Sequence, residues 1–231
     1  MTLSDLPAPL TWLTMTILVF AAADAISRLT NRHPLAHPVL TSTPVVILLL
    51  VVLHTPYETY KTATFPLSFL LGPTTVCLAV PIWKYRQVIR DNLQPLALAL
   101  SAGSLTAIVS AVGVAWAFGA SPQVLASLAP RATTTPVAMA IADQLHGLGS
   151  LAAVAVLLSG VLGAVIYPFL FDRLGVRDAH AIGLAVGVSA HGIGTARAFQ
   201  NDEKEGTFAA VGMGANAIFT AVVLGIASLT L

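Results

Sequence analysis

Long apolar stretches, separated by short segments that hold most of the charged residues, dominate this sequence of 231 residues. A helix needs roughly 20 apolar residues to cross a bilayer, where the protein itself must satisfy every backbone polar group. Charged residues make up 9% of the chain, against about 25% in a typical soluble domain. The sequence therefore predicts an all-α membrane protein. Eight such runs lie at about 9–28, 37–54, 66–83, 92–118, 122–145, 148–171, 180–198 and 206–230.

We expect one transmembrane domain over residues 1–231. Pro and Gly interrupt several runs, which membrane helices tolerate where protein or a water-filled cavity satisfies the freed backbone. We therefore expect about eight spans or re-entrant segments, and the sequence leaves open which of the short runs cross the membrane and which re-enter it. Cationic side chains favour cytoplasmic loops. If the N-terminus is outside and every run crosses, Lys61, Arg173 and Arg177 lie outside. The inner group is then Arg28, Arg32, Lys84, Arg86, Arg90, Arg197 and Lys204.

Composition argues against several functional classes. The formal net charge is +1, so no basic face for nucleic acid stands out and we expect no nucleic-acid partner. No HExxH metal-ligand spacing and no Ser/Asp dyad motif occurs, so we do not expect an enzyme, a metal site or a cofactor. No carboxylate pair occupies the centre of a run, which favours an anion over a cation as ligand.

An internal repeat is suggested by matching segments that recur in the same order at nearly one spacing. An odd number of spans per copy would place the second copy upside down, as in many secondary transporters. We assign repeat 1 to about 37–118 and repeat 2 to about 129–206, with peripheral helices at about 9–28 and 206–230. Convergent membrane composition is the alternative explanation. The matched pairs are Thr41–Val45 with Thr133–Val137, Pro81 with Pro168, and Leu98–Ala107 with Val186–Ala196.

The first polar break lies in the fifth run, where Pro130 and Pro136 bracket Arg131 and three threonines. Proline in the first turn is a helix-start signal, so we predict a half-helix of about ten residues from Pro136, roughly 15 Å long. Its mate in the first copy would start at Pro44. Two helix N-termini would then point at one central region and favour an anion there.

The polar side chains of this break allow two interpretations. The hydroxyls of Thr133, Thr134 and Thr135 can orient a carboxylate, or they can cap the break locally without a ligand. The guanidinium of Arg131 can bind a carboxylate with two parallel hydrogen bonds, or it can extend to the membrane interface.

The second break is the segment GVSAHGIGTARAFQ, residues 187–200. Its glycines, Gly192 and Gly194 among them, permit irregular backbone or close helix contact. His191 can donate to a carboxylate or carry a coupled proton, or it can join two helices by a hydrogen bond. Thr195 belongs to the same break. Arg197 lies near the inner face, where we favour a topology anchor over a ligand.

Three sequence segments, PRATTTPVAMAI, GVLGAVIYP and GLAVGVSAHGIGTARAF followed by EGTFA, resemble the LrgB family of bacterial membrane proteins. The C-terminal part of the plastid glycolate/glycerate transporter is similar to the same family. The resemblance extends from about residue 35 to the end. The family motif is intact at Thr133, Thr134, Thr135, Pro136, His191, Gly192, Gly194, Thr195 and Arg197.

This resemblance implies a multi-pass protein of the bacterial inner membrane that transports small monocarboxylates such as glycolate, glycerate, pyruvate or lactate. The alternative is an antiholin-like regulator of murein hydrolase activity and autolysis. Beyond a carboxylate substrate and the lipid bilayer, a small LrgA-type membrane protein is the implied partner, and a homo-oligomer is compatible with the family. The LrgA-like half that is fused in the plastid protein has no match here, which leaves open whether this chain transports alone.

Overall fold

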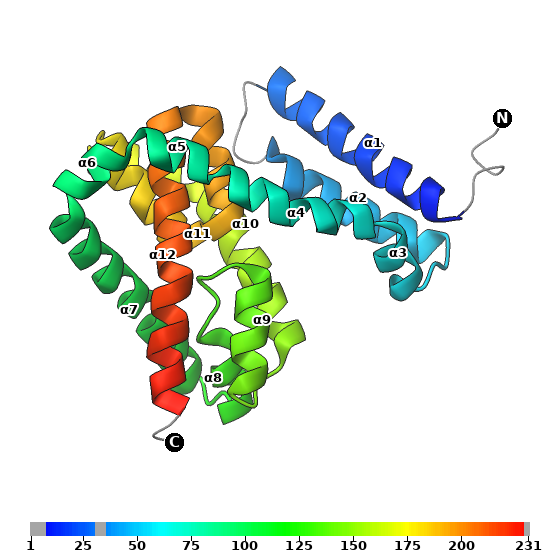
Figure 1. The fold of residues 1–231 in the computed structure, drawn as a ribbon. Helices are drawn as coiled ribbons and strands as arrows, with labels where there is room; N and C mark the ends of the chain where they lie inside the picture. Colours follow the sequence, from blue (N-terminus) through cyan, green and yellow to red (C-terminus); the bar gives the residue numbers. More distant parts are fainter. Residues whose placement is uncertain (1–7, 31–35, 229–231) are drawn as a thin grey trace. The chain divides into compact units, whose positions relative to one another are not determined.

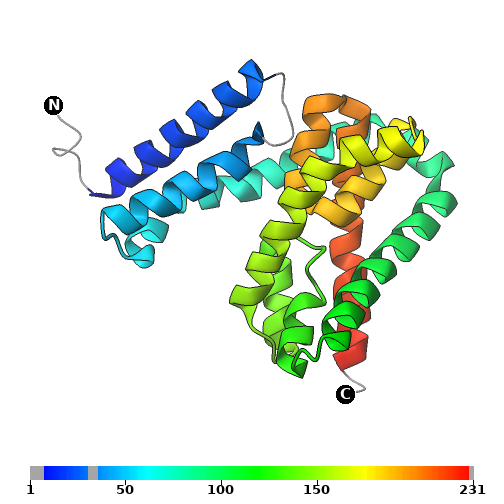
Figure 2. The same cartoon turned by 180° about the vertical axis from the view of Figure 1, so that it is seen from behind.

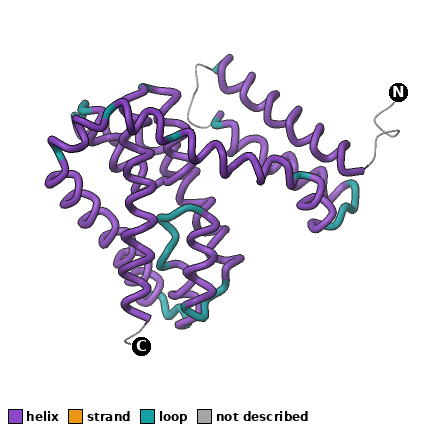
Figure 3. The backbone as a smooth tube through the Cα atoms, in the orientation of Figure 1, coloured by secondary structure: helices purple, strands orange, loops and turns teal. Residues whose placement is uncertain are grey.

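The computed structural model describes residues 8–30 and 36–228, and all regular structure within them is helical (Figure 3). The prediction of an all-α membrane protein is therefore confirmed. Contacts divide the chain into two compact units, Met1–Cys77 and Leu78–Leu231. Within residues 8–30 and 36–228, five stretches are long and apolar enough to cross a membrane: Leu10–Leu29, Phe65–Lys84, Leu93–Ala117, Gly149–Leu174 and Glu203–Ser228.

In the first unit, α1 packs along α2 and against α3 (Figures 1 and 2). The ring of Trp12 meets that of Tyr60 edge to face, with centroids 5.7 Å apart. This contact fixes the α1–α3 packing close to the start of α1. The helices of the unit are α1 (Ala8–Leu29), α2 (Pro38–Val52), α3 (Tyr57–Ala63) and α4 (Phe65–Cys77).

The predicted helix start at Pro44 is wrong. Helix α2 begins at Pro38 and continues through Pro44. The start lies earlier because Pro38 occupies the favoured first turn, and because the imidazole Nδ1 of His37 accepts a hydrogen bond from the backbone N–H of Val39 at 3.3 Å. Pro44 removes one backbone donor from the helix but does not end it.

The second unit contains the breaks and is built around three long helices, α7, α10 and α12. Three of the eight apolar runs, 37–54, 122–145 and 180–198, are absent from the candidate spans. The first is the 15-residue helix α2, and the other two belong to the second unit and fold back on themselves. The helices of the unit are α5 (Ala79–Lys84), α6 (Arg86–Asp91), α7 (Leu93–Ala117), α8 (Pro122–Leu128), α9 (Thr135–Gln144), α10 (Gly149–Leu174), α11 (Ala179–Asn201) and α12 (Glu203–Ser228).

The segment from α8 to α9 enters the bundle and returns to the same end. Ala129 and Ile141 pack together with Leu224 near the end of α12. Between them, the carbonyl of Ala132 accepts a hydrogen bond from Asn216, which lies two helical turns before Leu224, roughly 12 Å away. After α8 the chain therefore runs from the C-terminal end of α12 to its middle, and it returns to the C-terminal end through α9 (Figure 1).

Helix α11 also reverses direction. Gly183 packs against the carbonyl of Glu205, and Phe199 packs against the adjacent Gly206. A straight helix would separate Gly183 and Phe199 by roughly 24 Å, so both can meet neighbouring residues of α12 only if α11 folds back. The reversal lies at His191, whose backbone angles, φ 38° and ψ −131°, are not helical. We call residues 179–190 and 192–201 the first and second arms of α11.

The second arm returns to the end of the unit where α12 begins. Helix α7 also starts there, because Ser104 lies beside Asn216 while Ile108 packs near Leu224, so that α7 and α12 run in the same direction. The ion pair between Lys84 and Glu203, 2.6 Å, places α5 at this end as well. We call it the cationic end, since apart from Arg131 it holds the Lys and Arg residues of the second unit. They are Lys84, Arg86, Arg90, Arg173, Arg177, Arg197 and Lys204.

The expectation that Arg173 and Arg177 lie opposite Lys84 is therefore wrong. It assumed that the run 180–198 crosses the membrane, whereas α11 turns back at His191. The inverted repeat itself stays a prediction. Two observations bear on its details: α2 is continuous through Pro44, and the α7 segment that matches the break of α11, Leu98–Ala107, is unbroken helix.

Candidate functional site

The tips of the two re-entrant segments meet at the middle of the second unit. The amide nitrogen of Asn216, at the midpoint of α12, donates to the carbonyl oxygens of Ala132 at 2.7 Å and of Val188 at 3.2 Å. The first carbonyl belongs to the α8–α9 tip and the second to the α11 tip. Ser104, near the midpoint of α7, donates to the amide oxygen of Asn216 at 2.5 Å.

The backbone of the α8–α9 tip is shaped by its prolines and threonines. Pro130 closes a turn in which its carbonyl accepts from both the backbone N–H of Thr133, at 3.0 Å, and the hydroxyl of Thr133, at 2.9 Å. Thr134 then has extended backbone angles, and Pro136 lies in the first turn of the ten-residue helix α9. The predicted half-helix at Pro136 is confirmed, with its start one residue earlier.

Around this tip, several polar groups remain available to bind a ligand. The hydroxyls of Thr134 and Thr135 are half-buried and form no hydrogen bond with another described residue, and no side chain caps the start of α9. The guanidinium of Arg131 is half-buried and forms no ion pair with an acidic residue in the described part of the chain. The carbonyl of Arg131 accepts from Ser159 of α10 at 3.1 Å. This tip therefore presents a cation, hydroxyls and an uncapped helix N-terminus together.

The α11 tip is organised by His191, which is buried. Its imidazole Nε2 lies 3.0 Å from the carbonyl oxygen of Val156 in α10. The ring also packs on Gly160, where an added Cβ would collide with it. A carbonyl can only accept, so Nε2 carries the proton of this contact. His191 thus joins two helices, which is one of the two interpretations that the sequence leaves open.

The other residues of this break have different environments. Gly194 is buried, and a Cβ there would lie 2.5 Å from the Cβ of Ala190, so a glycine lets the two arms approach. Buried Thr195 donates its hydroxyl to the carbonyl of His191 at 2.7 Å. Gly192 is exposed, and a Cβ added there would lie 3.9 Å from the Sδ of Met213, an ordinary contact. The second arm therefore starts at the tip with an accessible backbone.

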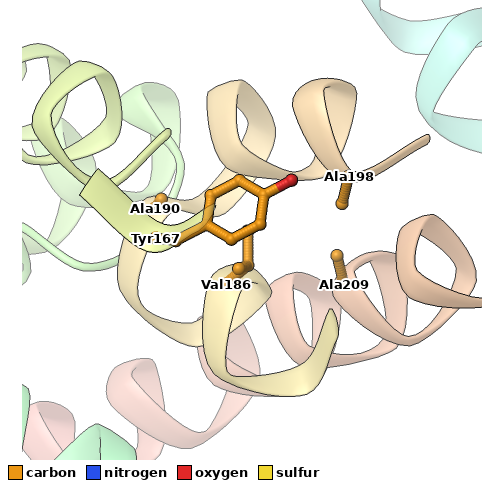
Figure 4. Close-up of a cluster of buried hydrophobic side chains, with 5 residues drawn as sticks. All are labelled: Tyr167, Val186, Ala190, Ala198 and Ala209. Atoms are coloured by element: carbon orange, nitrogen blue, oxygen red, sulfur yellow. The ribbon is translucent and has the colours of Figure 1, made fainter. Parts of the chain in front are cut away.

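Arg197 lies away from the tips, in the second arm near the cationic end. It donates to Gln200 at 3.4 Å, and the adjacent Ala198 packs against Tyr167 of α10. Tyr167 packs where both arms of α11 meet α10 and α12 (Figure 4). The structure therefore does not bring Arg197 together with Arg131 and His191.

Three polar residues of the unit escaped the sequence analysis. Asn216 and Glu205 are buried in α12, and Ser104 is buried in α7. Asn216 is the one amide side chain in α12, and an isolated polar residue in an apolar run is a signal of function or of helix contact. Glu205 accepts from Asn201 at 2.6 Å through one carboxylate oxygen, while the other is buried and has no hydrogen-bond partner in the part of the chain that the structure describes.

A cavity of about 500 Å³ lies beside the α11 tip, between α7, α10 and the first arm of α11. Its lining is almost entirely apolar, with residues such as Gly103, Ile166 and Leu184. The polar groups of the tips therefore do not open into this cavity. Among the described residues, no group of His, Cys, Asp and Glu side chains could hold a metal ion.

Comparisons with known proteins identify the family. A family model described as LrgB-like family matches residues 16–229. YwbG of Bacillus subtilis (strain 168) is 33% identical over 208 residues, which cover 89% of this chain and 91% of YwbG. YxaC of the same strain is 33% identical, covering 85% and 86%. Holin-like protein CidB of Staphylococcus aureus (strain N315) is 25% identical over 96% of both chains. No solved structure matches. The chain, a multi-pass bacterial membrane protein, therefore belongs to the LrgB-like family.

Proposed function

We propose first that the chain is a holin-like membrane protein that regulates murein hydrolase activity and autolysis from the inner membrane. The observation that carries this proposal is the similarity to holin-like protein CidB along 96% of both chains. It supports this function better than it supports transport. A small LrgA-type membrane protein is the partner that we propose for it.

The packing of the tips is compatible with such a role. His191, Thr133 and Thr195 are buried, and each forms a hydrogen bond with a backbone carbonyl. The neighbouring cavity is apolar. A regulator that acts through helix contacts needs no water-filled path, so dry packing of these residues does not impair it.

The test is expression of the chain in a bacterium that lacks its own LrgB-like proteins, with and without an LrgA-type partner. We expect a changed rate of autolysis and of murein hydrolase release. The matched control is Gly187→Leu, in which a side chain collides with α12 and the fold is lost. Identical autolysis with the wild type, this variant and an empty vector would contradict a regulatory function.

A second candidate, a carrier of small monocarboxylates, is favoured by one specific geometric observation. Two re-entrant segments meet mid-bundle, and each starts a helix there: α9 at Thr135 and the second arm of α11 after His191. Helix N-termini carry a partial positive charge and unpaired N–H groups, and broken helices of this kind bind substrates in secondary transporters. The pair differs from the predicted one, because the second helix start belongs to α11, and no helix starts at Pro44.

For this second function, the geometry favours particular ligand groups. Arg131, Thr134 and Thr135 keep their side-chain donors available, whereas Thr133, Thr195 and His191 use theirs within the protein. We therefore propose that a carboxylate binds at the start of α9 and that an adjacent hydroxyl or keto group contacts a threonine.

Uptake of radiolabelled glycolate and acetate into liposomes that contain only this protein tests the carrier. Thr134→Val should weaken glycolate uptake about 5- to 150-fold and acetate uptake less, because a buried hydrogen bond is worth about 1–3 kcal/mol. Thr106→Val, on an exposed face of α7, is the matched control and should behave as wild type. Absence of uptake of either substrate would eliminate an unassisted carrier and leave the holin-like function.

A further inference from the structure

We propose that Asn216 is a positioning residue that couples the two re-entrant segments, so that their tips open and close as one unit. This inference goes beyond both candidate functions and stands whichever of them holds. Asn216 is completely buried at the midpoint of α12. The α11 arms pack along α12 on one side of this midpoint, and Ala129 and Ile141 pack near Leu224 on the other.

The side chain of Asn216 uses its full hydrogen-bonding capacity. An asparagine amide has two N–H donors and an oxygen that can accept twice. Both donors are used, for the carbonyls of Ala132 and Val188. The oxygen accepts from Ser104 at 2.5 Å and from Thr220 at 3.3 Å. One side chain thus connects both tips, α7 and its own helix.

The orientation of this amide is determined by its partners. Carbonyl oxygens cannot donate, so the NH₂ group must face Ala132 and Val188. An amide turned by half a rotation would set its oxygen against both carbonyls and leave buried acceptors unsatisfied, which is costly in a membrane interior. The coupling therefore requires an amide, not merely a residue of similar size.

Other hydrogen bonds hold each tip separately. His191 joins the α11 tip to α10 through Val156, and Ser159 of α10 donates to the carbonyl of Arg131 in the α8–α9 tip. Loss of either bond frees one tip from α10. Loss of the Asn216 side chain removes one hydrogen bond from each tip at the same time, so both tips should loosen together.

Hydrogen–deuterium exchange of the full chain in lipid nanodiscs tests the coupling. Peptides that cover residues 129–138 and 186–195 report the two tips. In Asn216→Ala we expect both to exchange about 5- to 150-fold faster, which corresponds to the loss of about 1–3 kcal/mol. Thr220→Val, one turn away, removes only the longer of the two bonds to the amide oxygen, 3.3 Å against 2.5 Å for Ser104, and should stay close to wild type. His191→Ala leaves Asn216 in place and should accelerate exchange at both tips, whereas in the Asn216→Ala background it should add a further increase at the α11 tip alone.

Two further variants keep the test decisive if Asn216→Ala folds poorly. Asn216→Asp retains the size and the acceptor for Ser104 but presents oxygen to both carbonyls, so both tips should again loosen. Ser104→Ala leaves Asn216 in place and removes one bond that orients it, so a smaller, parallel increase is expected at both tips. Faster exchange at one tip only would overturn the proposal. So would a uniform increase that includes the middle of α7 and α10, since that indicates global destabilisation without coupling.

Discussion

The imidazole of His191 donates to the carbonyl oxygen of Val156 across 3.0 Å, at the point where α11 reverses beside α10. The contact is buried, so its loss should destabilise the fold by about 1–3 kcal/mol. We expect His191→Phe to lower the thermal unfolding temperature in detergent, and His191→Gln, which can still donate, to lower it less.

The control for this prediction is His146→Ala. His146 also has a positive φ, 59°, but its side chain is exposed. A surface change of this kind typically alters stability by less than about 0.5 kcal/mol. If His191→Phe is as stable as wild type, the hydrogen bond to Val156 does not hold the reversal in place.

Close packing between the first arm of α11 and α12 gives a second prediction. A Cβ added at Gly187 would collide with the carbonyl of Ala209, which is backbone and cannot swing away, whereas Gly214 has nothing within 4 Å. Gly187→Ala should therefore destabilise strongly. Gly214→Ala should be neutral or stabilise by up to about 1 kcal/mol, since alanine favours helix. Thermal unfolding of both variants, compared with wild type, measures the contrast; equal effects would mean that the two helices are not in contact at Gly187.

A pH dependence is expected from the cap of α11. The carboxylate of Asp178 accepts from the backbone N–H groups of His180, at 2.7 Å, and Ala181, at 3.1 Å. These bonds to Ala181 and His180 lower the pKa of Asp178 below its ordinary value of 3.8. A group with a lowered pKa in the folded state contributes stability above its unfolded pKa, and this contribution is lost as the pH falls through the folded pKa.

Asp178→Asn keeps a capping oxygen without the charge, so its stability should fall less than that of wild type when the pH is lowered from 7 to about 3. At neutral pH, Asp178→Ala should cost about 0.5–2 kcal/mol. Unfolding temperatures recorded across this pH range provide the comparison. Parallel pH profiles for wild type and Asp178→Asn would show that the cap contributes nothing through its charge.

The sequence was sufficient for the apolar runs and for the start of α9, because both depend on local chemistry. Run length follows from bilayer thickness, and the helix start at Thr135 follows from the adjacent Pro136. Pro44 carried the same local signal, yet α2 continues through it. A proline ends a helix only where nothing else favours continuation, and the earlier start at Pro38 was the stronger signal.

The reversal of α11 could not be derived from local patterns. It depends on the contacts of Gly183 and Phe199 with α12, which are tertiary. The roles of Ser104 and Asn216 depend on the same arrangement, because their hydrogen bond joins residues from distant helices. The glycines near His191 indicated irregular backbone or close packing, but they did not indicate that the chain would turn back there.

The reversal leads to a prediction about membrane orientation. With α11 and the α8–α9 segment re-entrant, Arg90, Arg177 and Arg197 lie at the cationic end of the second unit together with its other Lys and Arg residues, apart from Arg131. Cytoplasmic loops are enriched in Lys and Arg, so we expect the cationic end to face the cytoplasm. The opposite end, where Ser121 starts the α8–α9 segment, should face outward.

Single-cysteine labelling can distinguish this orientation from one in which α11 crosses the membrane. The natural cysteine, Cys77, is the one cysteine in the sequence, so Cys77→Ser provides a background without thiols. In spheroplasts, a membrane-impermeant maleimide should label Ser121→Cys directly, and label Arg90→Cys and Arg177→Cys only after permeabilisation. All three positions are exposed. The decisive position is Arg177. If Arg177→Cys is labelled from outside while Arg90→Cys stays protected, α10 ends outside, and Arg90 and Arg177 do not lie at the same end of the second unit as the fold indicates.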